Sequence, residues 1–118
     1  MDNTNTHTDS RGTIKDLLVT DEYSITYVTF NEGAVRGNHY HKETLQFDQV
    51  LKGKLLFSKN GEETIVDVMD ITKSDKNDKH AYKALEPSEI VSICFGKRIG
   101  SHYEEDTYRL SDDEKLIK

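Results

Sequence analysis

The sequence has no tryptophan, one cysteine, and no long run of apolar or basic residues. A single cysteine, Cys94, cannot form a disulfide within the chain, which favours a reducing compartment, and we expect the cytoplasm. No apolar run approaches the roughly 20 residues that cross a membrane. The polar opening MDNTNTHTDS lacks the apolar centre of a signal peptide. With a net charge of −6 and no basic run, neither a membrane nor a nucleic acid is an expected partner.

The apolar content is also low. The 118 residues fit one domain, and hydrophobic residues make up 34% of them, which predicts a thin core. An interface with a second copy would add the missing burial, and bare strand edges favour such pairing. We therefore expect a homodimer. Cys94 lies in an apolar segment and is expected to be a small core residue rather than a ligand or nucleophile.

Short segments rich in β-branched and aromatic residues dominate the chain and are separated by Gly, Asn and Asp. The composition predicts strands at Tyr23–Phe30, at Leu45–Leu51, in the HAYKAL segment and at Glu89–Gly96. Asn60-Gly61 predicts a hairpin turn. Positions 45, 47 and 51 are apolar and share one strand face. No convincing helical period precedes residue 110, so the sequence predicts an all-β sandwich or barrel.

Both ends are expected to lie outside the main domain. Residues 1–8 predict a loose, flexible tail, and residues 9–110 a single β domain. Residues 111–118, SDDEKLIK, predict a C-terminal tail or a short helix. Ser111 is its expected cap, and acidic residues fill its first turn.

Two histidines two residues apart stand in the segment RGNHYHKETLQFDQVLKG. Successive strand residues point to opposite faces, so His39 and His41 should share a face and Tyr40 should point away. After a turn, Gln46 can return to the same neighbourhood from the next strand. Asp48, two positions further, should share the face of Gln46. The alternative without a role in the site is that Asp48 is a strand acid paired with a nearby lysine.

A third histidine, His80, precedes another strand-like segment and can join the first pair. Three imidazoles and the Gln46 amide could hold a divalent ion such as Zn, Fe, Mn or Ni, so His39, His41, Gln46 and His80 are candidate metal ligands. The histidines could instead move protons near neutral pH. A pair of histidines on a solvated strand is the alternative without function.

Other polar and aromatic residues have plain alternatives. Lys42 is a candidate phosphate contact or a solvated lysine. His7 and His102 are expected at the surface. Tyr103 and Tyr108 could close over a sugar ring, although packing against a dimer partner is favoured.

With Gly33 in front and Gly53 behind, the histidine segment reads G-x5-H-x-H-x4-Q-x6-G. This spacing resembles the first motif of the cupin family, whose usual form has Glu at the position of Gln46. The resemblance implies a single cupin barrel, that is, a double-stranded β-helix or jelly-roll.

The second cupin motif is matched less completely, in the segment MDITKSDKNDKH. The chain has Met69, Asp75 and Asn77 where that motif has Gly, Pro and Gly, and Ala84 where it closes with Asn. His80 keeps the histidine of the motif.

Among cupins, DSRG and RGNHYHKETLQ resemble segments of the dTDP-4-keto-6-deoxyhexose 3,4-ketoisomerases. VRGNHY and HAYKAL resemble segments of the dTDP-4-dehydrorhamnose 3,5-epimerases, and RGNHYHK also resembles the cupin half of capsular-polysaccharide reductases. YEEDTYRL resembles C-terminal segments of such sugar cupins. The resemblance implies an isomerase or epimerase of a nucleotide-linked 4-keto-6-deoxy sugar in surface-polysaccharide biosynthesis. It implies His39 and His41 as acid/base residues and Arg36 as the group facing the diphosphate or a developing oxyanion.

The expected substrate is therefore a small molecule, a nucleotide sugar, and the sequence favours an enzyme. Arg36, Lys42, Gln46 and Asp48 are its candidate binding residues. Two rival functions remain: a metal-dependent cupin acting on a small molecule or free sugar, and a non-catalytic sugar-binding cupin.

Overall fold

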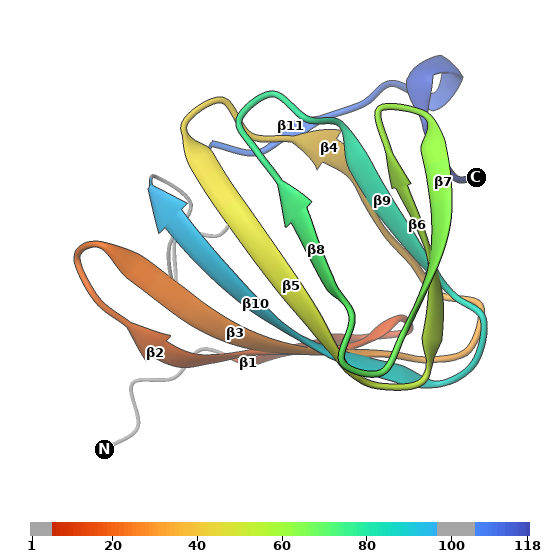
Figure 1. Cartoon of the computed structure of the whole chain (residues 1–118), viewed down its shortest axis with the longest axis horizontal. Helices are drawn as coiled ribbons and strands as arrows, with labels where there is room; N and C mark the ends of the chain where they lie inside the picture. Colours follow the sequence, from red (N-terminus) through yellow and green to blue (C-terminus); the bar gives the residue numbers. More distant parts are fainter. Residues whose placement is uncertain (1–5, 97–105) are drawn as a thin grey trace.

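A computed structural model describes residues 6–96 and 106–118. Two antiparallel sheets face each other, as Figure 1 shows, and the described ranges contain no helix long and apolar enough to cross a membrane. One sheet has six strands in the order β1-β2-β3-β10-β5-β8, and the other has five in the order β11-β4-β9-β6-β7. The predicted all-β fold with two packed sheets is confirmed.

The elements have the following bounds: β1 Thr6–Asp9, β2 Gly12–Val19, β3 Tyr23–Phe30, β4 Val35–Tyr40, β5 Thr44–Lys52, β6 Lys54–Lys59, β7 Glu62–Asp67, β8 Ile71–Ser74, β9 His80–Ala84, β10 Ser88–Gly96, β11 Tyr108–Arg109 and the 3₁₀ helix η2 Asp112–Glu114.

Most expected strands occur where the composition predicts them. The segment Tyr23–Phe30 is β3, and Asn60-Gly61 joins β6 to β7 with positive φ at both residues, as a tight hairpin turn requires. Gly53 turns β5 into β6 with φ +88°, and a Cβ there would overlap the Pro87 carbonyl oxygen. No larger residue fits this turn without moving the neighbouring backbone.

The N-terminal tail is shorter than predicted. Thr6–Asp9 forms β1 and pairs with the start of β2, from Thr6 opposite Lys15 to Asp9 opposite Gly12. The Asp9 carboxylate fixes the turn by accepting hydrogen bonds from the backbone N–H of Arg11 at 2.8 Å and from its guanidinium. These hydrogen bonds stabilise a turn that lets residues 6–8, expected to be part of a loose tail, join the sheet. Residues 1–5 lie outside the described ranges.

The apolar core is small and lies between the two sheets. It contains one cluster of nine buried side chains: Val28, Phe30, Val50, Leu55, Phe57, Val66, Tyr82, Ala84 and Ile90. The Tyr82 ring packs against Phe57 and Phe30, with centroid separations of 4.8 and 6.0 Å. Polar side chains occupy much of the remaining interior, so the sheets enclose a polar compartment beside the core.

Strand β5 turns its polar face inward. Gln46 and Asp48 are buried, whereas Leu45, Phe47 and Leu51 lie on the outer face and are partly or largely exposed. The shared apolar face predicted from positions 45, 47 and 51 exists, but it is directed away from the barrel interior. The interior face of this strand is thus available for chemistry.

The C-terminal segment docks on β4. The Asn38 side chain donates to the Ile117 carbonyl at 2.8 Å and accepts from the Leu116 N–H at 2.8 Å. Ser111 donates its hydroxyl to Glu114 at the start of η2, a three-residue 3₁₀ helix in the segment expected to be a tail or a short helix. Leu110 and Ile117 are buried, so this segment is part of the packed structure.

Two residues that replace motif glycines keep a glycine-like backbone. Met69 has φ +78° and Asn77 has φ +70°. Asparagine tolerates this left-handed region, whereas a long side chain such as methionine is strained there. The turn geometry of the second motif therefore survives, with strain at Met69.

We predict that Met69→Gly stabilises the protein by about 0.5–1 kcal/mol, because relief of left-handed strain outweighs the entropy of a glycine in the unfolded chain. Val68→Gly is the matched control: Val68 is also exposed but has no positive φ, and this change should destabilise by a similar amount. Urea unfolding measures both. A Met69→Gly protein less stable than the parent would show that the turn is not strained.

Candidate functional site

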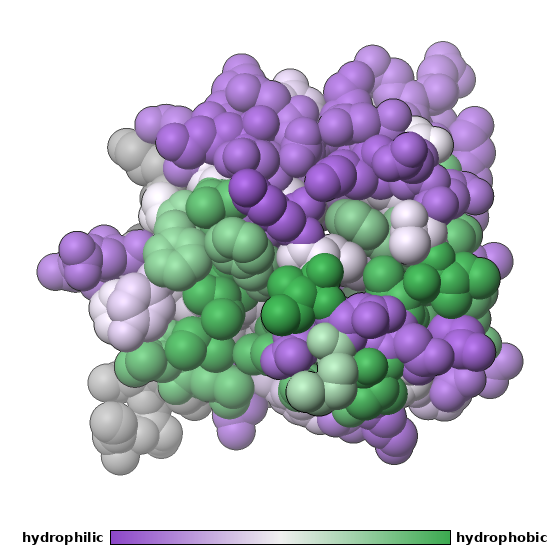
Figure 2. Space-filling model, in the orientation of Figure 1, coloured by the Kyte–Doolittle hydropathy of each residue, from purple (hydrophilic) through white to green (hydrophobic). Residues whose placement is uncertain are grey.

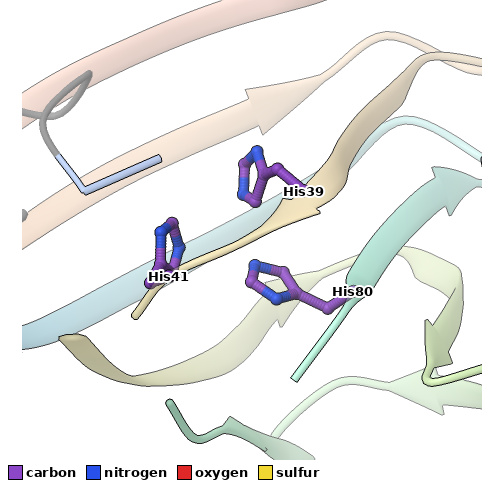
Figure 3. A group of neighbouring side chains, drawn as sticks. All are labelled: His39, His41 and His80. Atoms are coloured by element: carbon purple, nitrogen blue, oxygen red, sulfur yellow. The ribbon is translucent and has the colours of Figure 1, made fainter. Parts of the chain in front are cut away.

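Three histidines converge between the sheets. His39 lies on β4, His41 follows the end of that strand, and His80 opens β9 directly opposite His39. One ring nitrogen from each lies within 4.8 Å of the others, and Figure 3 shows the three rings directed toward one another. His41 and His80 are almost fully buried, while His39 is partly exposed. The expected shared face of His39 and His41 is confirmed.

A β-bulge adds Arg36 to the same interior. Simple alternation would place Arg36 and His39 on opposite faces, because they are three residues apart. Pairing with β9 skips Asn38, and Gly37 and Asn38 have φ of +96° and +58°. The extra residue reverses the alternation, as bulges do. Arg36 and His39 consequently line one pocket.

Backbone carbonyls orient two of the three imidazoles. His41 Nδ1 lies 2.9 Å from the Asp106 carbonyl oxygen, and His80 Nδ1 lies 3.1 Å from that of Asp78. A carbonyl only accepts, so each Nδ1 carries a proton. This fixes the tautomer of the neutral rings and leaves Nε2 as the nitrogen with a lone pair, as in most histidine metal ligands.

The Gln46 amide is oriented by a buried carboxylate. Its Nε2 donates to both oxygens of Asp48, at 2.9 and 3.0 Å, and Asp48 also accepts from the hydroxyls of Tyr82 and Ser92. Burial, followed by the Asp48 charge, raises the pKa of Tyr82 well above its usual value, so this hydroxyl stays protonated and donates. Gln46 and Asp48 share a face as predicted, and Asp48 accepts hydrogen bonds from all three of these groups.

Two acceptors consequently face each other. The Gln46 Nε2 group is directed at Asp48, so Gln46 Oε1 must point the other way, where it lies 3.3 Å from His41 Nε2. A neutral His41 with its proton on Nδ1 would put a lone pair against that oxygen. A positive charge resolves this: a second proton on His41, or a metal ion for which His41 and Gln46 would be ligands.

The donor set fits a divalent metal. Three imidazole nitrogens and one amide oxygen are neutral ligands suited to Zn, Fe, Mn or Ni, and three protein histidines are typical of catalytic sites that leave a position for water or substrate. Metal bonds of about 2.1 Å would place tetrahedral ligand atoms about 3.4 Å apart, so the three nitrogens, which lie within 4.8 Å of one another, would have to move closer on binding. Among the His, Cys, Asp and Glu side chains of the described residues, the three histidines form this group, and Asp48 is not part of it.

Asp106 fastens the C-terminal segment to the histidine loop. Its carboxylate accepts from the N–H groups of Lys42 and Glu43 and from the Thr44 hydroxyl, at 2.7–2.9 Å. Desolvation alone would raise the pKa of Asp106, but these hydrogen bonds outweigh it and hold the pKa below its usual value. One residue therefore fixes both the loop and, through its carbonyl, the His41 ring.

A pocket of about 240 Å³ opens beside the histidines. His39, His80 and Gln46 line it, and Arg11, Arg36 and Arg109 bring positive charge to its wall. Burial, with a further contribution from the Arg11 charge, lowers the pKa of Arg36 to about 10, so the group remains cationic at neutral pH.

Arg36 is only partly satisfied. It is 8% exposed, one terminal nitrogen donates to the Thr29 carbonyl at 3.3 Å, and its guanidinium lies 5.4 Å from the Phe30 ring centre. Its Nε has no hydrogen-bond partner among the residues the structure describes. A buried cation with remaining donor capacity suits an anionic ligand.

The other candidates lie elsewhere. Lys42 sits 4.3 Å from the Tyr108 ring centre, and Tyr108 stacks on Tyr40, outside the group of residues that line the pocket. Tyr40 thus points away from the histidines, as expected. His7 is exposed, as predicted, yet it lies at the pocket edge. His102 and Tyr103 fall outside the described residues.

Sequence reasoning missed several site residues. Asp106 lies 65 positions from His41, and no local pattern connects the two. Tyr82 stands two residues after His80, so alternation could have placed it on the same inner face. Arg11 follows Asp9 in the DSRG segment, and Arg109 pairs opposite His39 through β11.

Comparisons with known proteins identify the fold. No family model matches the chain, and no curated protein sequence matches it. Among solved structures, KdgF from Halomonas sp. aligns with a TM-score of 0.75 at 23% identity, over 80% of this chain and 87% of that one. An RmlC-like cupin from Shewanella frigidimarina aligns with a TM-score of 0.72 at 16% identity, over 81% and 86%. The chain has the cupin fold.

A third similar structure is the capsular polysaccharide assembling protein CapF from Staphylococcus aureus, with a TM-score of 0.77 at 18% identity. The alignment covers 94% of this chain and 33% of CapF, so this chain spans about a third of that protein. At these identities the likeness establishes the fold.

We predict that Asp48→Asn weakens binding of a divalent metal roughly 10–100-fold, because the Gln46 amide loses the partner that turns its oxygen toward His41. The double variant Gln46→Glu with Asp48→Asn should regain at least the parent affinity, since the introduced asparagine can donate to the new carboxylate. Calorimetric titration of chelator-treated protein with Zn²⁺ measures each affinity.

Asp16→Asn serves as the control, because Asp16 is an equally buried acid on β2 that bonds to Thr26. It should leave the metal affinity unchanged. Equal affinities for the parent and Asp48→Asn would mean that Asp48 does not orient a ligand.

Proposed function

We propose that this protein is an isomerase or epimerase of a nucleotide-linked 4-keto-6-deoxy sugar. One observation carries the proposal: His41 Nε2 and Gln46 Oε1 lie 3.3 Å apart, next to His39 and a pocket with a cationic wall. We infer that this contact holds a positive charge. Proton removal beside a ketone creates negative charge on the ketone oxygen, and a fixed positive charge stabilises it.

His39 is the residue proposed for the proton step. Of the three histidines it is the partly exposed one, and it lines the pocket. As a base it takes the proton from the carbon beside the ketone, whose bonding electrons pass to the oxygen and form an enolate. Return of the proton to another carbon, or to the other face, completes isomerisation or epimerisation without any other reactant.

Arg36 is proposed to bind the anionic part of the substrate. The pocket volume of about 240 Å³ is below the usual range for whole drug-sized ligands, so it suits a sugar ring. The nucleotide diphosphate would then lie toward Arg36, with Arg11 and Arg109 nearby. A planar guanidinium suits this role because it binds phosphate in a bidentate manner.

A second candidate is a metal-dependent cupin that acts on a free sugar or small carboxylate. The facing acceptors favour it, because a metal ion held by His39, His41, His80 and Gln46 would also supply the missing charge. Such an ion, when bound, would act as a Lewis acid on the substrate carbonyl. Arg36 would still bind the anionic group.

We predict that Arg36→Met weakens binding of dTDP at least about tenfold, while the free energy of unfolding stays within about 1 kcal/mol of the parent or rises. Methionine keeps much of the apolar stem but removes a buried cation with an unsatisfied Nε. Calorimetry and urea unfolding measure the two effects. Unchanged dTDP binding would exclude Arg36 from the substrate site.

The proposed chemistry predicts deuterium exchange. NMR of dTDP- and UDP-4-keto-6-deoxyglucose in D₂O with the protein should show deuterium at C3 or C5, or a new keto isomer. His39→Ala should slow this by about 10²–10⁴-fold, the usual contribution of a general base. The exchange rate is measured for the chelated and for the metal-loaded protein. Exchange by the chelated protein indicates that a proton supplies the positive charge, and exchange only by the loaded protein indicates a metal ion.

Lys42→Ala is the matched control, because Lys42 is a neighbouring cation that lies against Tyr108. Its exchange rate should equal that of the parent. If neither form of the protein exchanges either substrate faster than buffer, the catalytic proposal is wrong, and a sugar-binding role replaces it.

A further inference from the structure

A loop outside the strands holds two of the three histidines. Residues 75–79 join β8 to β9, and the backbone N–H of Asn77 donates to the His41 carbonyl oxygen at 2.6 Å. The carbonyl oxygen of Asp78, the next residue, lies 3.1 Å from His80 Nδ1. The position of this loop therefore affects where both histidines lie and which nitrogen of His80 carries the proton.

Apolar packing does not hold residues 75–79 in place. Four of these five residues are exposed, and only Asp78 is partly buried. Figure 2 shows hydrophilic side chains along the upper edge of the molecule, where Figure 1 places this loop and the turn from β6 to β7. Because the loop has no part in the apolar core, its conformation depends on hydrogen bonds.

Asn60 supplies three such hydrogen bonds from the turn between β6 and β7. Lys59 pairs opposite His80, so this turn lies directly beside the loop. Asn60 Oδ1 accepts from the Lys79 N–H at 2.9 Å, and Asn60 Nδ2 donates to Asp78 Oδ1 at 3.1 Å. Its backbone N–H donates to the Lys79 carbonyl at 2.7 Å. One exposed amide is thus bonded, through both of its polar groups, to the two residues that precede His80.

Asparagine meets two separate demands at this position. The turn has φ +53° at residue 60, a conformation that asparagine, aspartate and glycine tolerate. The contact needs a donor and an acceptor on one short side chain, because the Lys79 N–H donates and the Asp78 carboxylate accepts. Glycine keeps the turn but removes the side-chain contact. Aspartate keeps the turn but brings a second carboxylate against Asp78, so the two demands can be tested apart.

We propose that Asn60 is a positioning residue for the histidine site: it fixes residues 75–79 and, through the Asp78 carbonyl, the ring of His80. A fixed carbonyl that accepts from Nδ1 keeps Nε2 as the nitrogen with a lone pair, whether that atom binds a metal or accepts a proton. This role rests on the proposed function only through the histidine site, and it does not depend on the identity of the substrate.

The test is ¹⁵N NMR of the His80 ring in the chelator-treated full chain. The parent should carry a proton on Nδ1, and its exchange with water is measured. Asn60→Gly and Asn60→Asp should each speed this exchange at least about fivefold, because the loop opens more often without the two side-chain hydrogen bonds. The effect of Asn60→Asp should be the larger one, since two carboxylates then repel each other.

A charge swap provides the rescue. Asn60→Asp combined with Asp78→Asn should restore the parent exchange rate, because the introduced asparagine can donate to the introduced aspartate. Asn31→Asp is the matched control: Asn31 is also exposed, and its amide joins two segments by donating to the Ser10 carbonyl at 2.8 Å. This variant should leave the exchange at His80 unchanged.

The His41 ring is an internal reference, because the Asp106 carbonyl holds its Nδ1 from a different segment. Its exchange should rise by less than that of His80. An equal rise would indicate opening of the whole domain and would overturn the proposal. Unchanged His80 exchange in folded Asn60→Gly and Asn60→Asp proteins, or a parent His80 without a proton on Nδ1, would overturn it too. No substrate is present in this experiment, so its failure is distinguishable from a failure of the sugar-exchange assay.

Discussion

The site depends on one electrostatic constraint: the Nε2 atom of a neutral His41 and the Oε1 atom of Gln46 would both be acceptors, and they face each other. Asp48 accepts from the Gln46 Nε2 group through both carboxylate oxygens, and the Asp106 carbonyl accepts from Nδ1 of His41. The remaining atoms, Gln46 Oε1 and His41 Nε2, lie 3.3 Å apart. A buried polar contact of this kind is costly unless a proton or a cation lies between the atoms. The protein therefore builds a place for positive charge from neutral side chains.

The fold supplies that place by combining segments distant in the chain. A bulge in β4 brings Arg36 to the pocket beside His39, and β9 contributes His80 opposite. The C-terminal segment closes the arrangement, since Asp106 holds both the loop after β4 and the His41 ring. The cupin motif usually has glutamate at the position of Gln46, and a glutamate there would place a second carboxylate against Asp48. The Gln46 amide instead donates to Asp48, so the two residues depend on each other.

The sequence predicts the strands and the histidine cluster well, because both depend on local composition and on alternation. His39 and His41 share a face for the same reason that Gln46 and Asp48 do. Alternation alone does not predict that Arg36 lines the pocket with His39, because this depends on the β-bulge at Gly37 and Asn38. The Asp106 contact depends on chain closure over more than sixty residues. Alternation groups the apolar side chains of β5, but it does not tell which face is buried, and here the polar face is inside.

The most direct test of the account is ¹⁵N NMR of the imidazole nitrogens, recorded for chelated and for Zn²⁺-loaded protein at neutral pH. The account predicts that His41 Nε2 carries a proton in the chelated protein and bonds to the metal in the loaded protein, while Nδ1 keeps its proton in both. A neutral His41 in the chelated protein, with its proton on Nδ1 and a lone pair on Nε2, would contradict it. Such a result would mean that the site tolerates the facing acceptors without any positive charge.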